Sequence, residues 1–171
     1  QQQRVAVARA LIGEPEVVKQ RGVVALWDGE YLPGQFVIAR AIDWAVPRAA
    51  EQGIAAVTVR RSHHIGCLAA LAKRAVEQGF IALIANSDPA GARVAPYGGT
   101  EALFTPDPFA IGYPGTPNPV LVDICASITT TSNRRANSAV RMAISARVSA
   151  SGSMLTVVSA KKKSRSLRMR M

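Results

Sequence analysis

Two adjacent histidines are the residues whose type and position best suit chemistry. They lie in "VRRSHHIGCLAALAKRA", residues 59–75, where an apolar segment gives way to a helical one, and the chain has no other histidine. A histidine at a helix N-terminus tends to stay neutral, which suits a proton acceptor at physiological pH. In an extended segment the two rings alternate in direction, so only one would face a cleft. Spacing alone leaves both catalysis and helix capping open.

Metal binding is a second interpretation of the same segment. His63, His64 and Cys67 form an H-H-x-x-C pattern, with Asp123 and Cys125 far along the chain. Zinc sites usually combine two closely spaced pairs of ligands, and the sequence contains no second pair. We therefore expect no metal site.

Asp123 is a further candidate, since it interrupts the apolar segment "VLVDICAS", residues 120–127. Burying a carboxylate in such a strand is costly unless the group is paired or hydrogen-bonded. Asp123 would contact a ligand, accept backbone amides or orient a histidine. A purely structural hydrogen bond at the strand end explains it equally well.

The elements that must position these residues alternate along the chain. Apolar, β-prone segments predict strands at 22–29, 54–61, 80–87 and 120–127. Helical patterns cover 1–12, 35–53 and 66–79. The inward face of the second helix is predicted as Phe36, Ala39, Ile42, Ala45 and Val46. Both histidines then lie on a strand-to-helix turn, where α/β proteins bind ligands because strand ends meet helix N-terminal amides. The Gly/Pro-rich stretch 88–119 predicts a binding surface or an edge.

The composition indicates a folded domain of the α/β class. Hydrophobic residues make up 49% of 171 residues, enough for a real core. No apolar run reaches the roughly 18 residues of a membrane helix, and no secretory leader is visible. The two cysteines form no disulfide framework, so we expect a cytoplasmic protein. Neither a G-x-G-x-x-G motif nor a P-loop occurs, which excludes the Rossmann fingerprint.

The net charge of +10 is confined to the end of the chain. Residues 1–132 carry 11 basic and 11 acidic side chains, whereas residues 133–171 carry 10 basic side chains and no acidic one. Such a break in composition predicts that residues 133–171 form a separate segment.

Three segments, in this order, resemble the type-2 malate/L-lactate dehydrogenase family from about residue 20 to about residue 132. "DGEYLPGQFVIARAIDWAVPRAAEQGIAAVTVRRSHHIG" is similar to the family's glycine-glutamine helix and its strand ending in a Ser-x-His-x-Gly turn. "AVEQGFIALIANSDPAGARVAPYGGTEALFTPDP" resembles its next strand and proline-containing loop, and "VLVDICASITTTS" its Asp-hydrophobic-x-x-Ser segment. The resemblance implies a non-Rossmann, NAD(P)-binding dehydrogenase fold with a mixed sheet and helices, present here incompletely.

The resemblance also assigns roles to residues. His64, at the histidine position of the Ser-x-His-x-Gly turn, would accept the substrate proton during hydride transfer between NAD or NADP and a 2-hydroxy or 2-keto acid. Ser87, Val122, Asp123 and Ile124 match positions that line the cofactor site. Intact relatives are expected to be homodimers. His63 receives no role.

The chain departs from the family in ways that reduce its expected activity. It has "TPDP" at 105–108 where many members have Gly-Thr-Asn-Pro, and it lacks the N-terminal Ser-His-Gly motif. Members are about twice as long. We therefore expect residues 1–19 to be a remnant of an N-terminal helical region and residues 20–132 to be a partial cofactor-binding domain. A chain truncated in this way is expected to be weak or inactive.

The basic segment 133–171 allows three interpretations. Its Arg, Ser, Ala and Met content is typical of an out-of-frame reading of a GC-rich gene, so we expect a frameshifted or disordered tail. A basic arm for nucleic acid or another polyanion is the alternative, although no aromatic residue is present for stacking. A non-catalytic remnant with exposed apolar surface would instead self-associate.

Overall fold

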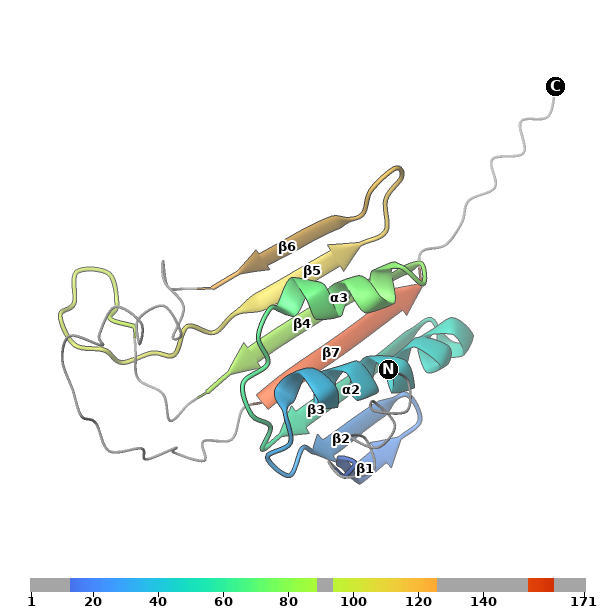
Figure 1. The fold of residues 1–171 in the computed structure, drawn as a ribbon, viewed down its shortest axis with the longest axis horizontal. Helices are drawn as coiled ribbons and strands as arrows, with labels where there is room; N and C mark the ends of the chain where they lie inside the picture. The colour runs from blue at the N-terminus through green and yellow to red at the C-terminus, as the bar shows by residue number, and fades with distance from the viewer. Residues whose placement is uncertain (1–12, 89–93, 126–153, 162–171) are drawn as a thin grey trace, which may run out of the picture.

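A seven-stranded mixed sheet with two helices forms the structure. The computed structural model describes residues 13–88, 94–125 and 154–161 (Figure 1). The strands are β1 (Glu16–Arg21), β2 (Val24–Asp28), β3 (Ile54–Arg60), β4 (Phe80–Ser87), β5 (Phe109–Tyr113), β6 (Val120–Ile124) and β7 (Met154–Lys161). The helices are α2 (Gly34–Gln52) and α3 (Leu68–Val76). The predicted α/β class, with a mixed sheet and helices, is confirmed.

The strand directions place several strand ends at one end of the sheet. The order is β1-β2-β3-β7-β4-β5-β6. Strand β2 is parallel to β3, whereas β7 is antiparallel to both β3 and β4, and β5 is antiparallel to β4 and β6. Strands β2, β3, β4 and β6 therefore point the same way, as their arrowheads in Figure 1 show. We call the place where they terminate the carboxyl end of the sheet; their last residues are Asp28, Arg60, Ser87 and Ile124.

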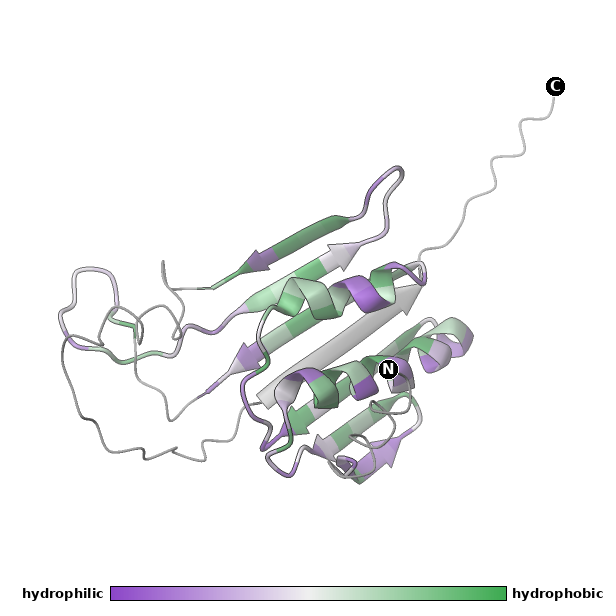
Figure 2. Ribbon diagram, viewed as in Figure 1, coloured by the Kyte–Doolittle hydropathy of each residue, from purple (hydrophilic) through white to green (hydrophobic). Residues whose placement is uncertain are grey.

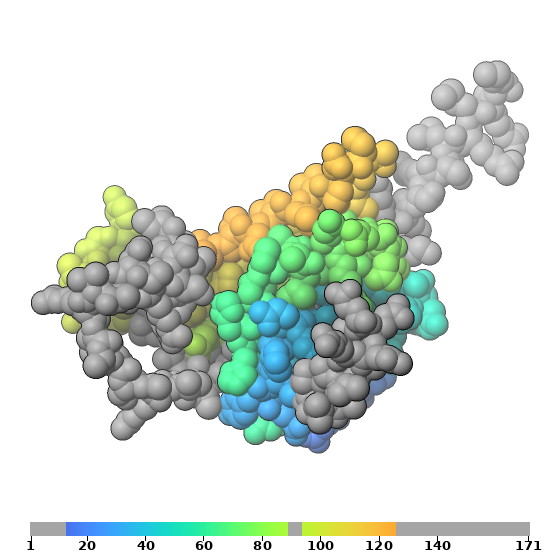
Figure 3. Space-filling view, in the orientation of Figure 1, coloured from blue at the N-terminus to red at the C-terminus, as the bar shows by residue number. Residues whose placement is uncertain are grey.

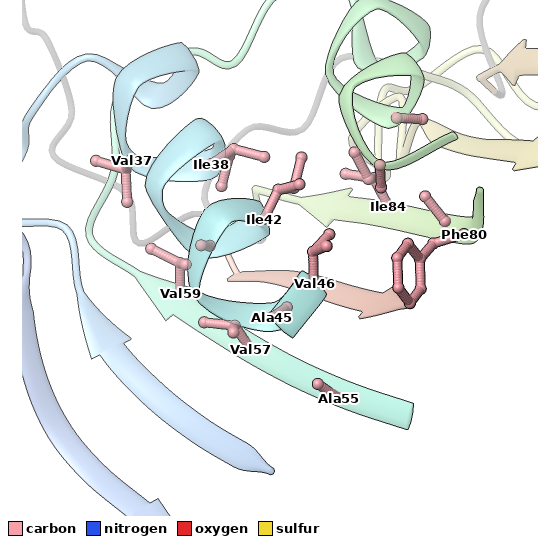
Figure 4. Close-up of a cluster of buried hydrophobic side chains, with 14 of the residues drawn as sticks. Val37, Ile38, Ile42, Ala45, Val46, Ala55, Val57, Val59, Phe80 and Ile84 are labelled. Atoms are coloured by element: carbon pink, nitrogen blue, oxygen red, sulfur yellow. The ribbon is translucent and has the colours of Figure 1, made fainter. Parts of the chain in front are cut away.

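Helices α2 and α3 cover one face of the sheet and bury the core there. Alternate residues of β3 and β4 point toward the helices, and Figure 4 shows Val57, Val59 and Ile84 facing Ile38 and Ile42 of α2. The buried side of α2 consists of Gly34, Val37, Ile38, Ala41, Ile42, Ala45, Val46 and Ala49. Of the residues predicted to face inward, Ile42, Ala45 and Val46 are buried, and the partly buried Phe36 packs against this core. Ala39 is only partly buried, because the buried stripe includes Val37, Ile38 and Ala41 instead.

The opposite face of β4, β5 and β6 is apolar and open. Paired residues share a face, and Leu83 pairs with Ile111, which pairs with Val122. The exposed apolar residues of this face are 37–58% exposed: Leu83, Ile111, Tyr113, Val120, Val122 and Ile124. Figure 2 shows most of β6 as hydrophobic, and Figure 3 shows the β5–β6 hairpin projecting beyond α3. This surface agrees with the expectation of self-association, which only a solution measurement can test.

Three strands were not predicted: β1, β5 and β7. Residues 16–19 were assigned to an N-terminal helical remnant, but they belong to β1, which pairs with β2 across a turn at Gly22. All residues of "EVVKQR" are exposed, and most are polar. The segment therefore lacks the apolar alternation that predicts a strand. Strand β5 lies within the Gly/Pro-rich stretch 88–119, where Pro108 and Pro114 flank it. The predicted helix at 1–12 lies outside the described residues.

Part of the basic segment lies at the centre of the sheet. Strand β7, residues 154–161, pairs with β3 on one side and β4 on the other. The expectation of a disordered tail is therefore wrong for these eight residues. The other residues of 133–171 lie outside the described part of the chain. Within the described ranges, no helix is long and apolar enough to cross a membrane.

Candidate active site at the carboxyl end of the sheet

The two histidines lie in an irregular turn between β3 and α3. We call residues 62–66 the histidine turn. Ser62 and Ile65 are buried and anchor the turn, whereas His63 and His64 are exposed. Gly66 has a positive φ of 79°, and the helix begins at Leu68, two residues after the predicted start. The histidines lie on the strand-to-helix turn, as predicted.

The loop before α2 is hydrogen-bonded to residues 60–63, at the end of β3 and the start of the histidine turn. The Gly29 amide donates to the Arg60 carbonyl at 2.8 Å, and the Tyr31 amide donates to the Arg61 carbonyl at 2.6 Å. The His63 amide donates to the Leu32 carbonyl at 3.1 Å. The Tyr31 and His63 rings lie 6.0 Å apart between centroids. His63 therefore packs near Tyr31, and the hydrogen bonds to the loop before α2 fix the backbone at this turn.

Gly34 lets the N-terminus of α2 approach the histidines closely. A Cβ atom at this position would lie 2.3 Å from the His63 carbonyl oxygen and 2.7 Å from the His64 carbonyl oxygen. Both contacts are with backbone, which cannot move aside without moving the turn. Glycine at position 34 is therefore required by the position of the histidines.

Asp28 holds the start of the histidine turn from the end of β2. Its side chain is fully buried and accepts hydrogen bonds from Arg60 Nε at 2.9 Å and from Arg61 Nε at 2.8 Å. Arg61 Nη2 donates at 2.5 Å, and the Glu30 amide adds a bond at 3.0 Å. The hydrogen bonds from Arg61 are the main reason that the pKa of Asp28 falls to about 2, despite burial that would raise it.

Asp123 contacts the other end of the same segment. Its Oδ2 atom accepts a hydrogen bond from the Ala69 amide at 2.9 Å and lies 3.6 Å from Cys67 Sγ. Asp123 is exposed, since β6 is an edge strand of the sheet. Among the possibilities that the sequence left open, the structure shows a bond from a backbone amide.

The end of β4 carries acceptors that suit a nucleotide. Ser87 is partly buried, and its neighbours Asn86 and Asp88 each have a buried Oδ1 atom without a hydrogen-bond partner among the residues that the structure describes. Buried acceptors without partners are rare and call for an explanation. A cofactor amide or ribose hydroxyl would supply the missing donors, so the residues at this strand end fit such a group.

The predicted residues come together only in part. His64 and Ser87 follow parallel strands separated by β7, which corresponds to a distance of about 10 Å between the strands. Asp123 lies on the helix-covered face, because it pairs with the buried Ala110. Val122 and Ile124 point to the open face instead, so the three predicted residues of β6 cannot contact one ligand from one side.

Three residues of this region received no role in the sequence analysis: Asp28, Arg60 and Arg61. Asp28 ends β2, Arg60 ends the parallel strand β3 and Arg61 follows it, so their meeting depends on the pairing of β2 with β3. The signal in the sequence was Asp28 itself, an acidic residue directly before Gly29 at the end of a predicted strand. No group of three metal-ligating side chains exists among the residues that the structure describes.

Comparison with known proteins identifies relatives of this arrangement. The sequence model of the malate/L-lactate dehydrogenase family matches residues 6–149, more than half of the chain and 17 residues beyond the end of the resemblance at 132. Malate dehydrogenase of Pyrococcus abyssi is 34% identical over 114 residues, which are 66% of this chain and 31% of the relative. (2R)-3-Sulfolactate dehydrogenase (NADP(+)) of Chromohalobacter salexigens is 35% identical over 92 residues, 53% of this chain and 27% of the relative.

A solved structure supports the same assignment. Malate dehydrogenase of Pyrococcus horikoshii OT3 superposes with a TM-score of 0.63 and 32% identity, over 70% of this chain and 34% of that one. The chain thus spans about a third of the length of these relatives. From the extent of the family match and this agreement in fold, the chain belongs to the malate/L-lactate dehydrogenase family.

Proposed function

We propose that the chain is the histidine-turn part of an NAD(P)-dependent oxidoreductase acting on 2-hydroxy and 2-keto acids. The observation that carries this proposal is the histidine turn, which presents His64 at the carboxyl end of the sheet and is held by Asp28, Gly34 and Asp123. Ligands of open α/β sheets bind at this end. The names of the relatives, malate and sulfolactate dehydrogenases, supply the substrate class.

His64 handles the proton in this proposal. When a 2-hydroxy acid is oxidised, one ring nitrogen of His64 accepts the hydroxyl proton as the C2–O bond becomes a carbonyl. The hydride from C2 goes to C4 of the nicotinamide, which is the chemistry that the cofactor supplies when bound. In the reverse direction His64 returns the proton to the oxygen. The exposure of His64 leaves its ring accessible to a substrate.

The end of β4 would hold part of the cofactor. Asn86 and Asp88 offer the unpartnered acceptors, and Ser87 lies between them. The resemblance adds Val122, Asp123 and Ile124 at the end of β6. We expect either NAD or NADP, a homodimer in longer relatives and a cytoplasmic location.

A cofactor titration tests this proposal directly. NADH and NADPH fluorescence would be titrated with the wild-type chain, with His64→Ala and with the matched control His63→Ala. We expect saturable binding that weakens several-fold in His64→Ala and is nearly unchanged in His63→Ala. Equal behaviour of the two variants would remove the special role of His64.

Polyanion binding by the basic segment is a weaker alternative. Strand β7 takes residues 154–161 of that segment into the sheet, which leaves less of it for an arm. A salt titration with DNA of several sequences separates the possibilities, since an arm with a biological role should prefer one partner whereas adventitious charge should not.

A further inference from the structure

Helix α3 begins without a capping side chain of its own. Its N-cap residue is Cys67, whose side chain makes no capping hydrogen bond, and the first turn contains no acidic residue. The first amides of a helix need acceptors, and the N-terminal end of its dipole favours a negative charge. Cysteine is a poor substitute for the Ser, Thr, Asp or Asn usually found there.

Asp123 supplies the missing acceptor from a neighbouring strand. Its carboxylate accepts from the amide of Ala69, the second residue of the helix, at 2.9 Å. The same oxygen lies within hydrogen-bond distance of the Cys67 thiol, at 3.6 Å. The Asp123 carboxylate therefore takes the place of an N-cap side chain, although it lies more than fifty residues from the helix start in sequence.

The packing of α3 on β5 makes this contact possible. A Cβ atom at Gly112 would lie 2.5 Å from Val76 Cγ2 and 3.3 Å from Ala72 Cβ, so the helix lies as close to the sheet as glycine permits. Asp123 is on the same face as Gly112, one strand further out. The close approach brings the N-terminus of α3 within reach of its side chain.

We propose that Asp123 is a positioning residue, which caps α3 and thereby fixes the histidine turn that precedes the helix. The inference rests on the proposed function of His64, on which Asp123 acts through the segment 65–69. In this role the carboxylate is committed to α3, in place of the direct cofactor contact that the resemblance implies for Asp123. Asp123 then links β6 to His64, two parts of the chain that lie on opposite sides of β4.

Nuclear magnetic resonance of the whole chain without cofactor tests the inference. The ring signals of His63 and His64 and the exchange rate of the Ala69 amide would be recorded at one pH for Asp123→Ala, Asp123→Asn and Asp43→Ala. Asp43 is the matched control, because it pairs with Arg74 near the other end of α3 at 2.6 Å. We expect Asp123→Ala to move the His64 signals and to speed exchange at Ala69 about fivefold, as the loss of a typical cap would. Asp123→Asn should restore both, and Asp43→Ala should change neither.

A second substitution separates capping from cofactor contact and covers a failure of Asp123→Ala to fold. Cys67→Ser combined with Asp123→Ala supplies a hydroxyl at the N-cap itself, which should restore folding and the His64 signals. Unchanged His64 signals in Asp123→Ala, or equal changes in Asp43→Ala, would overturn the proposal. So would weaker NADH binding in Asp123→Ala with unmoved His64 signals, which would indicate direct contact. None of these results depends on whether His64 transfers a proton, so the two proposals fail separately.

Discussion

Two carboxylates, Asp28 and Asp123, hold the two ends of the histidine turn by different physical means. Asp28 is fully buried and bonds two arginine side chains and an amide before the turn. Asp123 is exposed on an edge strand and bonds one amide after it. The first contact is a charged network within the fold, and the second is a capping interaction in contact with water.

This difference predicts unequal effects. Breaking the contact between a buried carboxylate and its arginines costs much more free energy of folding than breaking an exposed hydrogen bond. Asp28 should therefore contribute mainly to the stability of the chain, whereas Asp123 should mainly set the position of the turn. The substitutions below test that division, beginning with the largest expected effect.

Asp28→Ala should lower the free energy of unfolding by about 3 kcal/mol, because it removes the acceptor for two arginines and leaves the Glu30 amide unpaired. The measurement is urea denaturation followed by circular dichroism. Asp43→Ala, which breaks an exposed pair with Arg74, is the control and should cost less than about 1 kcal/mol. Equal losses in the two variants would mean that burial of Asp28 is irrelevant to its contribution.

Gly34→Ala should lower the free energy of unfolding by about 2 kcal/mol, as overpacking against backbone does. The added Cβ atom would overlap the carbonyl oxygens of His63 and His64, so the histidine turn must shift. Denaturation and the histidine ring signals would be measured together. Gly98→Ala is the control for steric overlap, because nothing lies within 4 Å of a Cβ atom there; its φ of +76° adds a backbone strain that Gly34 does not have. A Gly34→Ala chain with unmoved histidine signals would contradict the close packing.

Acid should weaken the fold through Asp28. Its folded pKa of about 2 lies below the ordinary value of 3.8, so its stabilising contribution is complete above about pH 4 and is lost as pH falls toward 2. Denaturation midpoints would be measured from pH 7 to pH 2 for wild type and Asp28→Asn. The difference between the two chains should shrink across that acid range. A constant difference would show that Asp28 is not ionised in the folded chain.

Asp123→Ala should have the smallest effect on stability, about 1 kcal/mol, which is typical of a lost helix cap. Asp28 and Asp123 share no hydrogen-bond partner, so the double variant should equal the sum of the single ones within about 0.5 kcal/mol. Denaturation of all four chains provides the cycle. A larger departure from additivity would mean that the two ends of the turn are coupled.

Local pattern predicted the elements that carry the histidines. Strand β4 has the predicted bounds, and β3 and α2 differ from their predictions by one residue. Helix α2 ends at Gly53, and β3 and β4 begin directly after Gly53 and Gly79. The local pattern missed β1 because only Val17 and Val18 of its residues are apolar, and it missed β5 because prolines flank that strand.

The contacts of the site depend on tertiary pairing, which a single sequence does not display. Asp28 meets Arg61 only because β2 and β3 are parallel, and Asp123 meets Ala69 only because α3 crosses β5 at Gly112. Likewise, the basic composition of residues 133–171 did not indicate that β7 pairs between β3 and β4. A frameshift near residue 132 stays a prediction, and the family match through residue 149 makes the coding DNA its most useful check. A dehydrogenase pattern in another frame past codon 132 would support it.

The central claim, that His64 serves hydride transfer at this end of the sheet, is tested most directly by isotope transfer. An excess of the chain would be mixed with NADH deuterated at C4, as separate 4R and 4S isomers, and with short 2-oxo acids. Mass spectrometry would then follow deuterium at C2 of the 2-hydroxy acid formed. We expect slow transfer from one isomer by wild type and His63→Ala, and none by His64→Ala. Transfer by His64→Ala at the wild-type rate would contradict this account.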